Sequence, residues 1–145
     1  MRIERCPFFG PDDIFKSVKN KIKQSRKKDE SIDYLTFVPD GEPTLDANLG
    51  YEIDRLKILG IKVAVISNGS LIYRDDVKAD LMKADWVSLK LDSTWNANWR
   101  KINRPHRDLA LLLILKGMLE FSKHFSGKLV METMLVHSIN IDANL

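Results

Sequence analysis

The chain has 145 residues, about the length of one domain, and its content of 44% hydrophobic and 30% charged residues excludes general disorder. The longest apolar run, 109–115, is too short to cross a bilayer, and the charged start of the chain is not followed by the apolar segment of a secretory signal. Because Cys6 is the only cysteine, an internal disulfide and a metal site built from several cysteines are excluded. These features predict a cytoplasmic protein with one packed core and no membrane contact.

The net charge of +3 is unevenly distributed along the chain. Seven lysines and arginines lie within residues 16–28, where there is no acidic residue, so the remainder of the chain carries a charge of −4. A basic helix can bind a phosphate backbone, but such a charge run is more often a solvated helix face. We therefore expect any contact of residues 16–28 with RNA to be sensitive to salt.

In the first half of the chain, two predicted helices alternate with two predicted strands. Apolar residues at helical spacing predict a helix over 12–28, and β-branched and aromatic residues predict a strand over 32–38. Leucines and isoleucines that recur every three or four residues predict a second helix from Leu45 to Leu59, which ends at Gly60. A near-continuous apolar strand is predicted over 61–66.

The second half continues the alternation. A short helix is predicted over 75–84 and a strand over 86–91, followed by a polar stretch with no predicted element up to His106. The strongest predicted helix spans about 108–125, and the last predicted strand spans 129–136.

Strands that alternate with helices predict the α/β fold class, with a parallel sheet and right-handed crossover connections. Ligands of such sheets bind at the carboxyl ends of the strands, which are here 39–43, 67–70, 92–93 and the residues after Val136. We expect residues 1–145 to form a single domain. Since the chain starts with a helix and stops just after a strand, we expect it to be a fragment of a larger domain.

Two of the predicted strand ends carry polar turns. Gly41-Glu42-Pro43 could place backbone groups and a carboxylate against a ligand ammonium, or it could be an ordinary turn between a strand and a helix. Ser67 and Asn68 could face the same ligand, but Asn68-Gly69 is also typical of the turn of a β-hairpin. The helices on either side favour the parallel arrangement.

The other two strand ends place polar side chains within a predicted sheet. Ser88, Lys90 and Asp92 alternate along one side of a strand, which indicates either a wet, ligand-lined interior or the solvent face of an edge strand. Glu132 and Met134 raise the same question on the last strand. The histidines have no metal-ligand spacing, and neither the G-x-x-x-x-G-K-[ST] nor the G-x-G-x-x-G motif is present. We therefore assign no metal site and no catalytic residue.

These segments, taken in order, resemble the radical S-adenosylmethionine (SAM) enzymes. The resemblance is closest to the Fe–S oxidoreductases related to the wyosine tRNA-modifying synthase, and it covers nearly the whole chain. Its motifs lie in 33–45, 66–71, 87–93, 102–105 and 132–136. It implies part of a TIM-type barrel in an enzyme that binds SAM and a [4Fe–4S] cluster, with RNA modification as the implied activity.

The chain departs from this family at its defining motif. The C-x-x-x-C-x-x-C loop, whose thiolates hold the cluster, is absent, and Cys6 lies where that loop has already ended. The last strands of the barrel are also absent, so the resemblance implies an interior segment from helix one to strand five. We expect no cofactor to bind stably to this chain and the chain itself to be inactive, with self-association through its exposed sheet edge.

The resemblance also implies roles for the strand-end residues. Gly41, Glu42 and Pro43 would hold the amino group of SAM, and Ser67 and Asn68 would line its methionine or ribose. Ser88, Lys90 and Asp92 would face ribose or carboxylate, and Glu132 and Met134 would lie near adenine. The alternatives are an α/β module that binds a nucleotide or RNA without redox chemistry, and a fragment of a phosphate-binding barrel.

Overall fold

The computed structural model describes residues 3–38 and 41–141. Its centre is a four-stranded sheet in the order β1-β2-β3-β4, in which every neighbouring pair is parallel. The strands are β1 (Tyr34–Phe37), β2 (Lys62–Ser67), β3 (Trp86–Lys90) and β4 (Lys128–Glu132). The predicted α/β fold with alternating strands and helices is confirmed. Because β2 pairs in parallel with both β1 and β3, the hairpin at Asn68-Gly69 is excluded.

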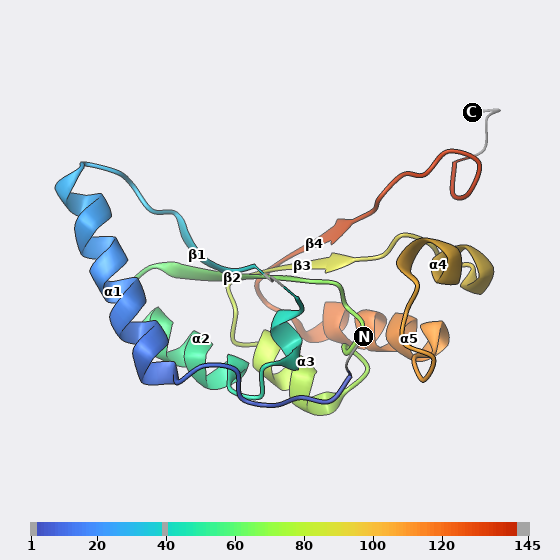
Figure 1. The fold of residues 1–145 in the computed structure, drawn as a ribbon, viewed down its shortest axis with the longest axis horizontal. Helices are drawn as coiled ribbons and strands as arrows, with labels where there is room; N and C mark the ends of the chain where they lie inside the picture. Colours follow the sequence, from blue (N-terminus) through green and yellow to red (C-terminus); the bar gives the residue numbers. More distant parts are fainter. Residues whose placement is uncertain (1–2, 39–40, 142–145) are drawn as a thin grey trace.

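Helices alternate with the strands along the chain, with α1 before β1 and the others between successive strands (Figure 1). They are α1 (Pro11–Lys27), the short 3₁₀ helix η1 (Pro43–Leu45), α2 (Leu49–Lys57), α3 (Asp75–Leu81), α4 (Asn96–Asn103) and α5 (Leu111–His124). In Figure 1, α2, α3 and α5 lie along one face of the sheet, whereas α1 flanks the β1 edge. Among the described residues, no helix has both the length and the apolar character needed to cross a membrane.

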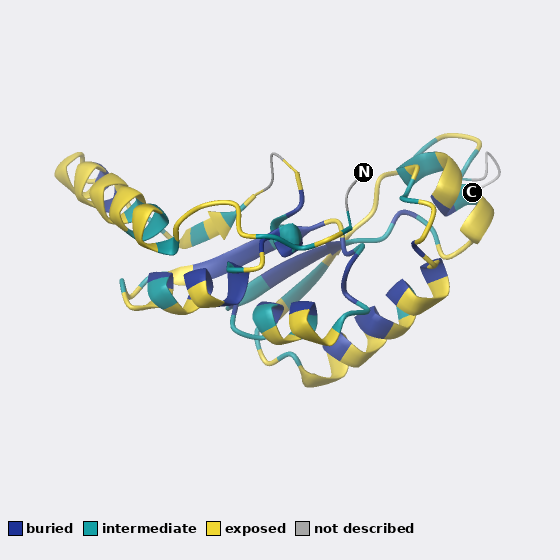
Figure 2. Cartoon of the chain, turned by 60° about the horizontal axis from the view of Figure 1, so that its bottom comes forward, coloured by how far each residue is buried: buried dark blue, intermediate teal, exposed yellow. Residues whose placement is uncertain are grey.

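The core lies between the sheet and these helices. Side chains alternate between the two faces of a strand, and the helix-facing positions of β2 and β3 are apolar and fully buried. These positions are Val63, Val65, Val87 and Leu89, and they pack with Leu49, Ile53, Val77, Leu81 and Phe121. In Figure 2, buried and exposed residues alternate along the helices that cover the sheet. Polar side chains of the sheet are therefore left to the opposite face and to the strand ends.

The helix predicted from Leu45 begins at Leu49, after η1, and two further segments differ from the prediction. Helix α4 lies in a stretch for which no element was predicted, because asparagine has low helix propensity. The stretch is helical because Trp99 is buried against the core. The last strand ends at Glu132 rather than at Val136. Residues beyond it are held by single contacts instead of a ladder: the Thr133 hydroxyl donates to the Leu91 carbonyl at 2.8 Å.

Arg5 anchors the N-terminal segment to the carboxyl edge of the sheet. Its guanidinium donates to the carbonyl oxygens of Thr44 (2.9 Å) and Asp46 (2.7 Å) and pairs with Asp76 (2.9 Å) and Asp80. The hydrogen bonds and charges of Arg74 and Arg5 lower the pKa of Asp76. Residues 3–10 are thereby fixed beside η1, so the chain enters α1 from the end of the sheet where the strands finish.

Candidate functional site

The site starts from a buried carboxylate that joins two strand ends. Glu42 Oε1 accepts hydrogen bonds from Thr44 N (3.0 Å), Thr44 Oγ1 (2.8 Å) and Ser67 Oγ (2.7 Å), and its Oε2 accepts one from Asn68 N (2.7 Å). Glu42 follows β1, whereas Ser67 and Asn68 end β2. The carboxylate therefore fixes the relative position of the first two polar turns that the sequence singled out.

The turn around Glu42 leaves space at the rim of the sheet. Gly41 is exposed, and a Cβ atom added to it would meet no atom of the described residues within 4 Å, its chain neighbours aside. Pro43 begins η1 and is half-buried. Pro39 and Asp40, which belong to the predicted strand end 39–43, lie outside the described residues. The backbone at Gly41 is thus exposed at the rim of the sheet.

The turn after β2 depends on a glycine. Gly69 has a φ of +70°, and a Cβ atom there would lie 2.6 Å from Met118 Cε. Ser67 Oγ accepts from Gly69 N at 3.0 Å, and Asn68 Oδ1 accepts from Ser70 N at 2.8 Å. These bonds leave Asn68 exposed at the rim.

A second buried carboxylate organises the ends of β3 and β4. Asp92, which is 2% exposed, accepts from Asn103 Nδ2 through Oδ2 (2.6 Å) and from Met134 N through Oδ1 (2.6 Å). Lys90 Nζ lies 3.8 Å from Asp92 Oδ2. Glu132 is the register partner of Lys90 on β4. Four of the predicted positions therefore meet at this end of the sheet.

A small cleft is lined by residues that bond to each of the two carboxylates, Asn68 to Glu42 and Asn103 to Asp92. Its volume is about 70 Å³, and Lys90 of β3 also lines it. Asn103 Oδ1 is buried without a hydrogen-bond partner among the described residues. A buried acceptor without a donor is costly, so a ligand hydroxyl or amino group would be favoured there. With the Lys90 ammonium beside it, the cleft suits a small polar or anionic group.

The remaining predicted residues differ in how far they are buried. Ser88 is buried on the same side of β3 as Lys90, one step further from the rim. Glu132 and Met134 are exposed, so Met134 is not a core residue. Within 3–38 and 41–141, no group of three or more His, Cys, Asp and Glu side chains could hold a metal ion. Asn103 lies in the segment 102–105 that resembles the family, but its place at the cleft depends on α4.

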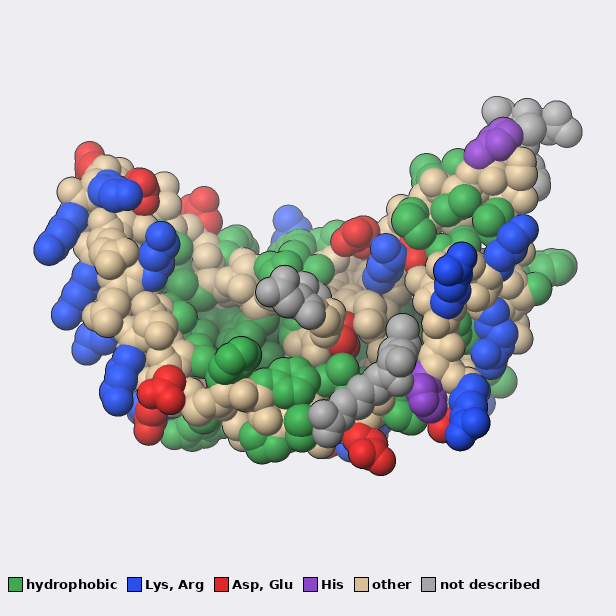
Figure 3. Space-filling view, in the orientation of Figure 1, with side chains coloured by type: hydrophobic (Ala, Val, Ile, Leu, Met, Phe, Trp, Pro, Cys, Tyr) green, Lys and Arg blue, Asp and Glu red, His purple; other side chains and the backbone are tan. Residues whose placement is uncertain are grey.

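The basic segment forms an exposed helix face. Only Ile22 and Ser25 of α1 are buried, and its lysines and arginines line the outer side of the molecule in Figure 3. We expect binding of tRNA to this chain to be weak and to fall steeply as salt is raised, because it would rest on phosphate contacts alone. Filter binding between 50 and 300 mM salt, roughly the range over which counterion release is resolved, measures this. Binding that persists at high salt and disappears in the double variant Lys21→Ala, Lys23→Ala would contradict this expectation.

Fold and site together define an α/β protein with a polar, carboxylate-organised rim at the carboxyl ends of a parallel sheet. The chain matches no protein-family model. It is 51% identical over 137 residues to a UPF0026 protein of Methanocaldococcus jannaschii, a match that covers 94% of the chain and 42% of the relative. It is 34% identical over 121 residues to a GTPase Obg of Brachyspira hyodysenteriae, covering 83% of the chain and 18% of the relative.

A further relative has a name that states a cofactor. The chain is 32% identical over 92 residues to an S-adenosylmethionine-dependent nucleotide dehydratase of a Thermoplasmatales archaeon, covering 57% of the chain and 33% of the relative. The chain therefore spans less than half the length of each of these three relatives. Because the chain has no G-x-x-x-x-G-K-[ST] motif, the match to the GTPase carries no GTP-binding function to it.

Proposed function

We propose that this chain is the SAM-binding part of a radical SAM core, within a longer enzyme similar to the wyosine tRNA-modifying synthase branch. The observation that carries the proposal is the Glu42 carboxylate, which ties the Gly41-Glu42-Pro43 turn to the Ser67-Asn68 turn. Both turns belong to segments whose sequences resemble that family. The similarity to a SAM-dependent nucleotide dehydratase supports the same cofactor.

The roles follow the geometry of the rim. Backbone groups at Gly41 and Pro43 hold the amino group of SAM, because both Glu42 oxygens already accept bonds from protein donors. Asn68 lies toward the methionine or ribose, and Lys90 faces the carboxylate. Asn103 Oδ1 is the natural acceptor for a ribose hydroxyl or an amino group. Glu132 and Met134, at the end of β4, lie toward the adenine.

The residues present do not fit a [4Fe–4S] cluster. Three thiolates are needed to leave one iron open, and Cys6 is the only cysteine; it is half-buried beside η1. We expect this chain to retain no stoichiometric iron and to form no 5′-deoxyadenosine after anaerobic reconstitution with iron and sulfide. Iron content, absorbance near the cluster bands and product chromatography measure this. Stoichiometric iron together with the radical product would contradict it.

The affinity of the chain for SAM is expected to be no better than about millimolar. Backbone hydrogen bonds contribute about 1 kcal/mol net each, and a handful of them must offset an association cost of at least ~4 kcal/mol. Amide NMR spectra recorded during a SAM titration test the site directly. We expect shifts at Gly41, Asn68 and Lys90 and at neighbouring rim residues.

Matched variants separate the site from general effects. Asn103→Leu removes the unpartnered acceptor and is expected to weaken SAM binding several-fold, whereas Asn20→Leu, on the exposed face of α1, leaves it unchanged. Shifts confined to other parts of the chain, or none at tens of millimolar SAM, would reject the proposed site.

One observation favours a second candidate function, an RNA- or nucleotide-binding module without redox chemistry. The exposed cations of α1 provide a phosphate-binding surface of their own. This candidate predicts that adenosine monophosphate binds at least as well as SAM and that RNA shifts the amide signals of α1. The SAM-binding proposal predicts a preference for SAM at the rim.

A further inference from the structure

The surface around α4 carries a concentration of positive charge. We call residues 94–107, which comprise α4 and the turns on either side of it, the α4 segment. Four of its residues are lysine or arginine and none is acidic, and all four cations are exposed: Arg100, Lys101, Arg104 and Arg107. Figure 3 shows lysine and arginine side chains gathered over α4 and α5, at the opposite end of the molecule from α1. The chain therefore has a second positive surface, separate from that of α1.

An exposed indole stands at the start of this segment. Trp95 is 75% exposed, the largest value among the large hydrophobic side chains of the described residues. Its backbone is nevertheless fixed, because Trp95 N donates to Ser93 Oγ at 3.1 Å and the Trp95 carbonyl accepts from the Trp99 amide at 2.9 Å. An aromatic ring held at the surface in this way is a platform on which a nucleobase stacks.

The cations follow this ring along the segment. The Arg100 guanidinium lies 5.7 Å from the centre of the Trp99 ring, and its Nη2 donates to the Leu109 carbonyl at 3.2 Å. These contacts hold the side chain in one place and leave it exposed. The Arg107 side chain is 90% exposed, with its Nε 3.6 Å from Asp108 Oδ1. Because a guanidinium pairs with a phosphate through two parallel hydrogen bonds, arginines placed in this way suit a phosphate backbone.

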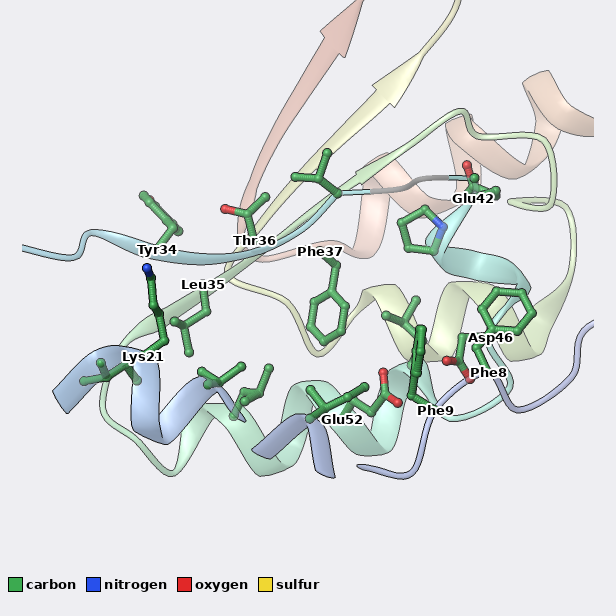
Figure 4. Close-up of a pocket in the computed structure, with 18 of the residues that line it drawn as sticks. Phe8, Phe9, Lys21, Tyr34, Leu35, Thr36, Phe37, Glu42, Asp46 and Glu52 are labelled. Carbon is green, nitrogen blue, oxygen red and sulfur yellow. The ribbon is translucent and has the colours of Figure 1, made fainter. Parts of the chain in front are cut away.

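Exposed aromatic side chains also lie at the groove between β1, α1 and α2, which has a volume of about 1030 Å³. Figure 4 shows Phe8 and Phe9 there beside the carboxyl groups of Asp46 and Glu52, while Lys21 lies at the far end. Carboxylates repel phosphates, so this groove does not combine base stacking with phosphate binding. The α4 segment combines an exposed ring with cations and has no acidic residue between them.

We propose that the α4 segment binds single-stranded nucleic acid, with a base stacked on Trp95 and the neighbouring phosphates on Arg100, Lys101 and Arg104. A single strand fits because its unpaired bases expose their faces to a protruding ring. The helical arms of a tRNA present paired bases and offer this surface phosphates alone. An acidic protein fits less well, since Trp95 is the only large hydrophobic side chain exposed within 94–107 and protein interfaces have an apolar core.

The α4 segment is joined to the rim of the sheet. Asn103 Nδ2 donates to the buried Asp92 carboxylate at 2.6 Å, and Asn103 lines the same cleft as Lys90. A strand bound along the segment therefore lies beside the proposed SAM site, where a nucleic-acid substrate would be needed. This relation to catalysis rests on the proposed function, whereas the binding of the strand does not.

Fluorescence anisotropy with labelled tetranucleotides tests the stacking contact. Tetrauridylate and its DNA counterpart are both used, and each is too short to bridge the α4 segment and α1, which lie at opposite ends of the molecule (Figure 1). We expect their dissociation constants to agree within about threefold, because the base face and the phosphates are common to both. Trp95→Ala is expected to weaken binding about tenfold, and Trp95→Phe by less than about threefold. The matched control, Ile58→Ala, trims a side chain that is 71% exposed elsewhere and is expected to leave binding unchanged.

Charge-matched variants separate this surface from α1. The pair Lys101→Gln and Arg104→Asn removes two cations, and asparagine tolerates the left-handed backbone at position 104, where φ is +44°. The slope of log K against log[salt] is expected to become shallower by roughly 1.4, since each phosphate contact with a single strand contributes about 0.7. The pair Lys19→Gln and Lys23→Gln removes the same charge from α1 and is expected to leave the slope unchanged.

The parent chain supplies a readout that needs no variant. In NMR spectra, the tetranucleotide is expected to shift the indole Nε1–H signal of Trp95 and to leave the amide signal of Gly41 in place, whereas SAM at the rim shifts Gly41. A failure of SAM binding therefore leaves this result intact.

Three outcomes would overturn the proposal. Unchanged affinity of Trp95→Ala would remove the stacked base. A shallower slope for the α1 pair instead of the α4 pair would place the strand on α1. A decaglutamate peptide that binds more tightly than either tetranucleotide would make an acidic protein the partner.

Discussion

Replacement of Glu42 by alanine is expected to lower the free energy of unfolding by about 4 kcal/mol, since four buried or partly buried donor groups lose a charged acceptor at ~1–3 kcal/mol each before relaxation. The donors are the Thr44 amide and hydroxyl, the Ser67 hydroxyl and the Asn68 amide, the first two belonging to one residue. Urea unfolding followed by circular dichroism measures the change.

Two further variants make the Glu42 result specific. Glu42→Gln keeps the volume and one acceptor oxygen, and it is expected to lose about half as much stability as the alanine variant. Glu132→Ala, at an exposed position of β4, is expected to change stability by no more than ~0.5 kcal/mol. A loss below about 1 kcal/mol for Glu42→Ala would mean that the carboxylate does not hold the two turns together.

Replacement of Glu52 by glutamine is expected to stabilise the chain in a pH-dependent way. The pKa of Glu52 is raised from 4.5 to about 7 in the folded protein. The folded state therefore binds the proton more tightly than the unfolded state, and stability falls as the pH rises from 4.5 to 7. Above that range the penalty is complete, at about 3 kcal/mol for a shift of this size. The variant removes the penalty.

The charged groups around Glu52 define the conditions of this experiment. Asp46 raises its pKa through charge repulsion, while Lys21 of α1 lines the same groove and Arg55 lies over the Phe15 ring at 4.7 Å. Thermal unfolding of Glu52→Gln and of the parent chain should coincide near pH 4.5 and diverge by pH 8. Glu30→Gln, at an exposed position, serves as the control. A gain that is the same at both pH values would contradict the assignment.

The strand order and most elements could be predicted from the sequence because the buried strands are short apolar runs. The predicted segment 61–66 differs from β2 by one residue at each end, and 86–91 differs from β3 by one residue at its carboxyl end. The sequence could not place α4, whose Asn-rich turn is helical because Trp99 packs into the core. The strand predicted up to Val136 was too long, since Asp92 and Asn140 bind the backbone there by side-chain contacts.

The position of the polar rim could be predicted because its residues lie in or directly after the last turns of strands in an alternating pattern. What could not be predicted is how Glu42 uses its oxygens, since the contact with Ser67 depends on the register between β1 and β2. Glu52 was missed, although a signal was present. It stands three residues after Leu49 and four before Leu56, on the apolar stripe of its helix, where an acidic side chain must be buried.

The all-parallel sheet also constrains how the chain folds. Its pairings join Tyr34 to Lys62, Ala64 to Trp86 and Trp86 to Lys128, so no strand pair can form as a local hairpin. Every contact between strands must first close a long loop, which is typical of slow-folding topologies. The β2–β3 pair closes the shortest loop, and the β3–β4 pair costs roughly 0.6 kcal/mol more in chain entropy for a loop about twice as long. Folding is therefore expected to start with the pairing of β2 and β3. The two sheet edges that remain open longest are β1, beside the groove between β1, α1 and α2, and β4.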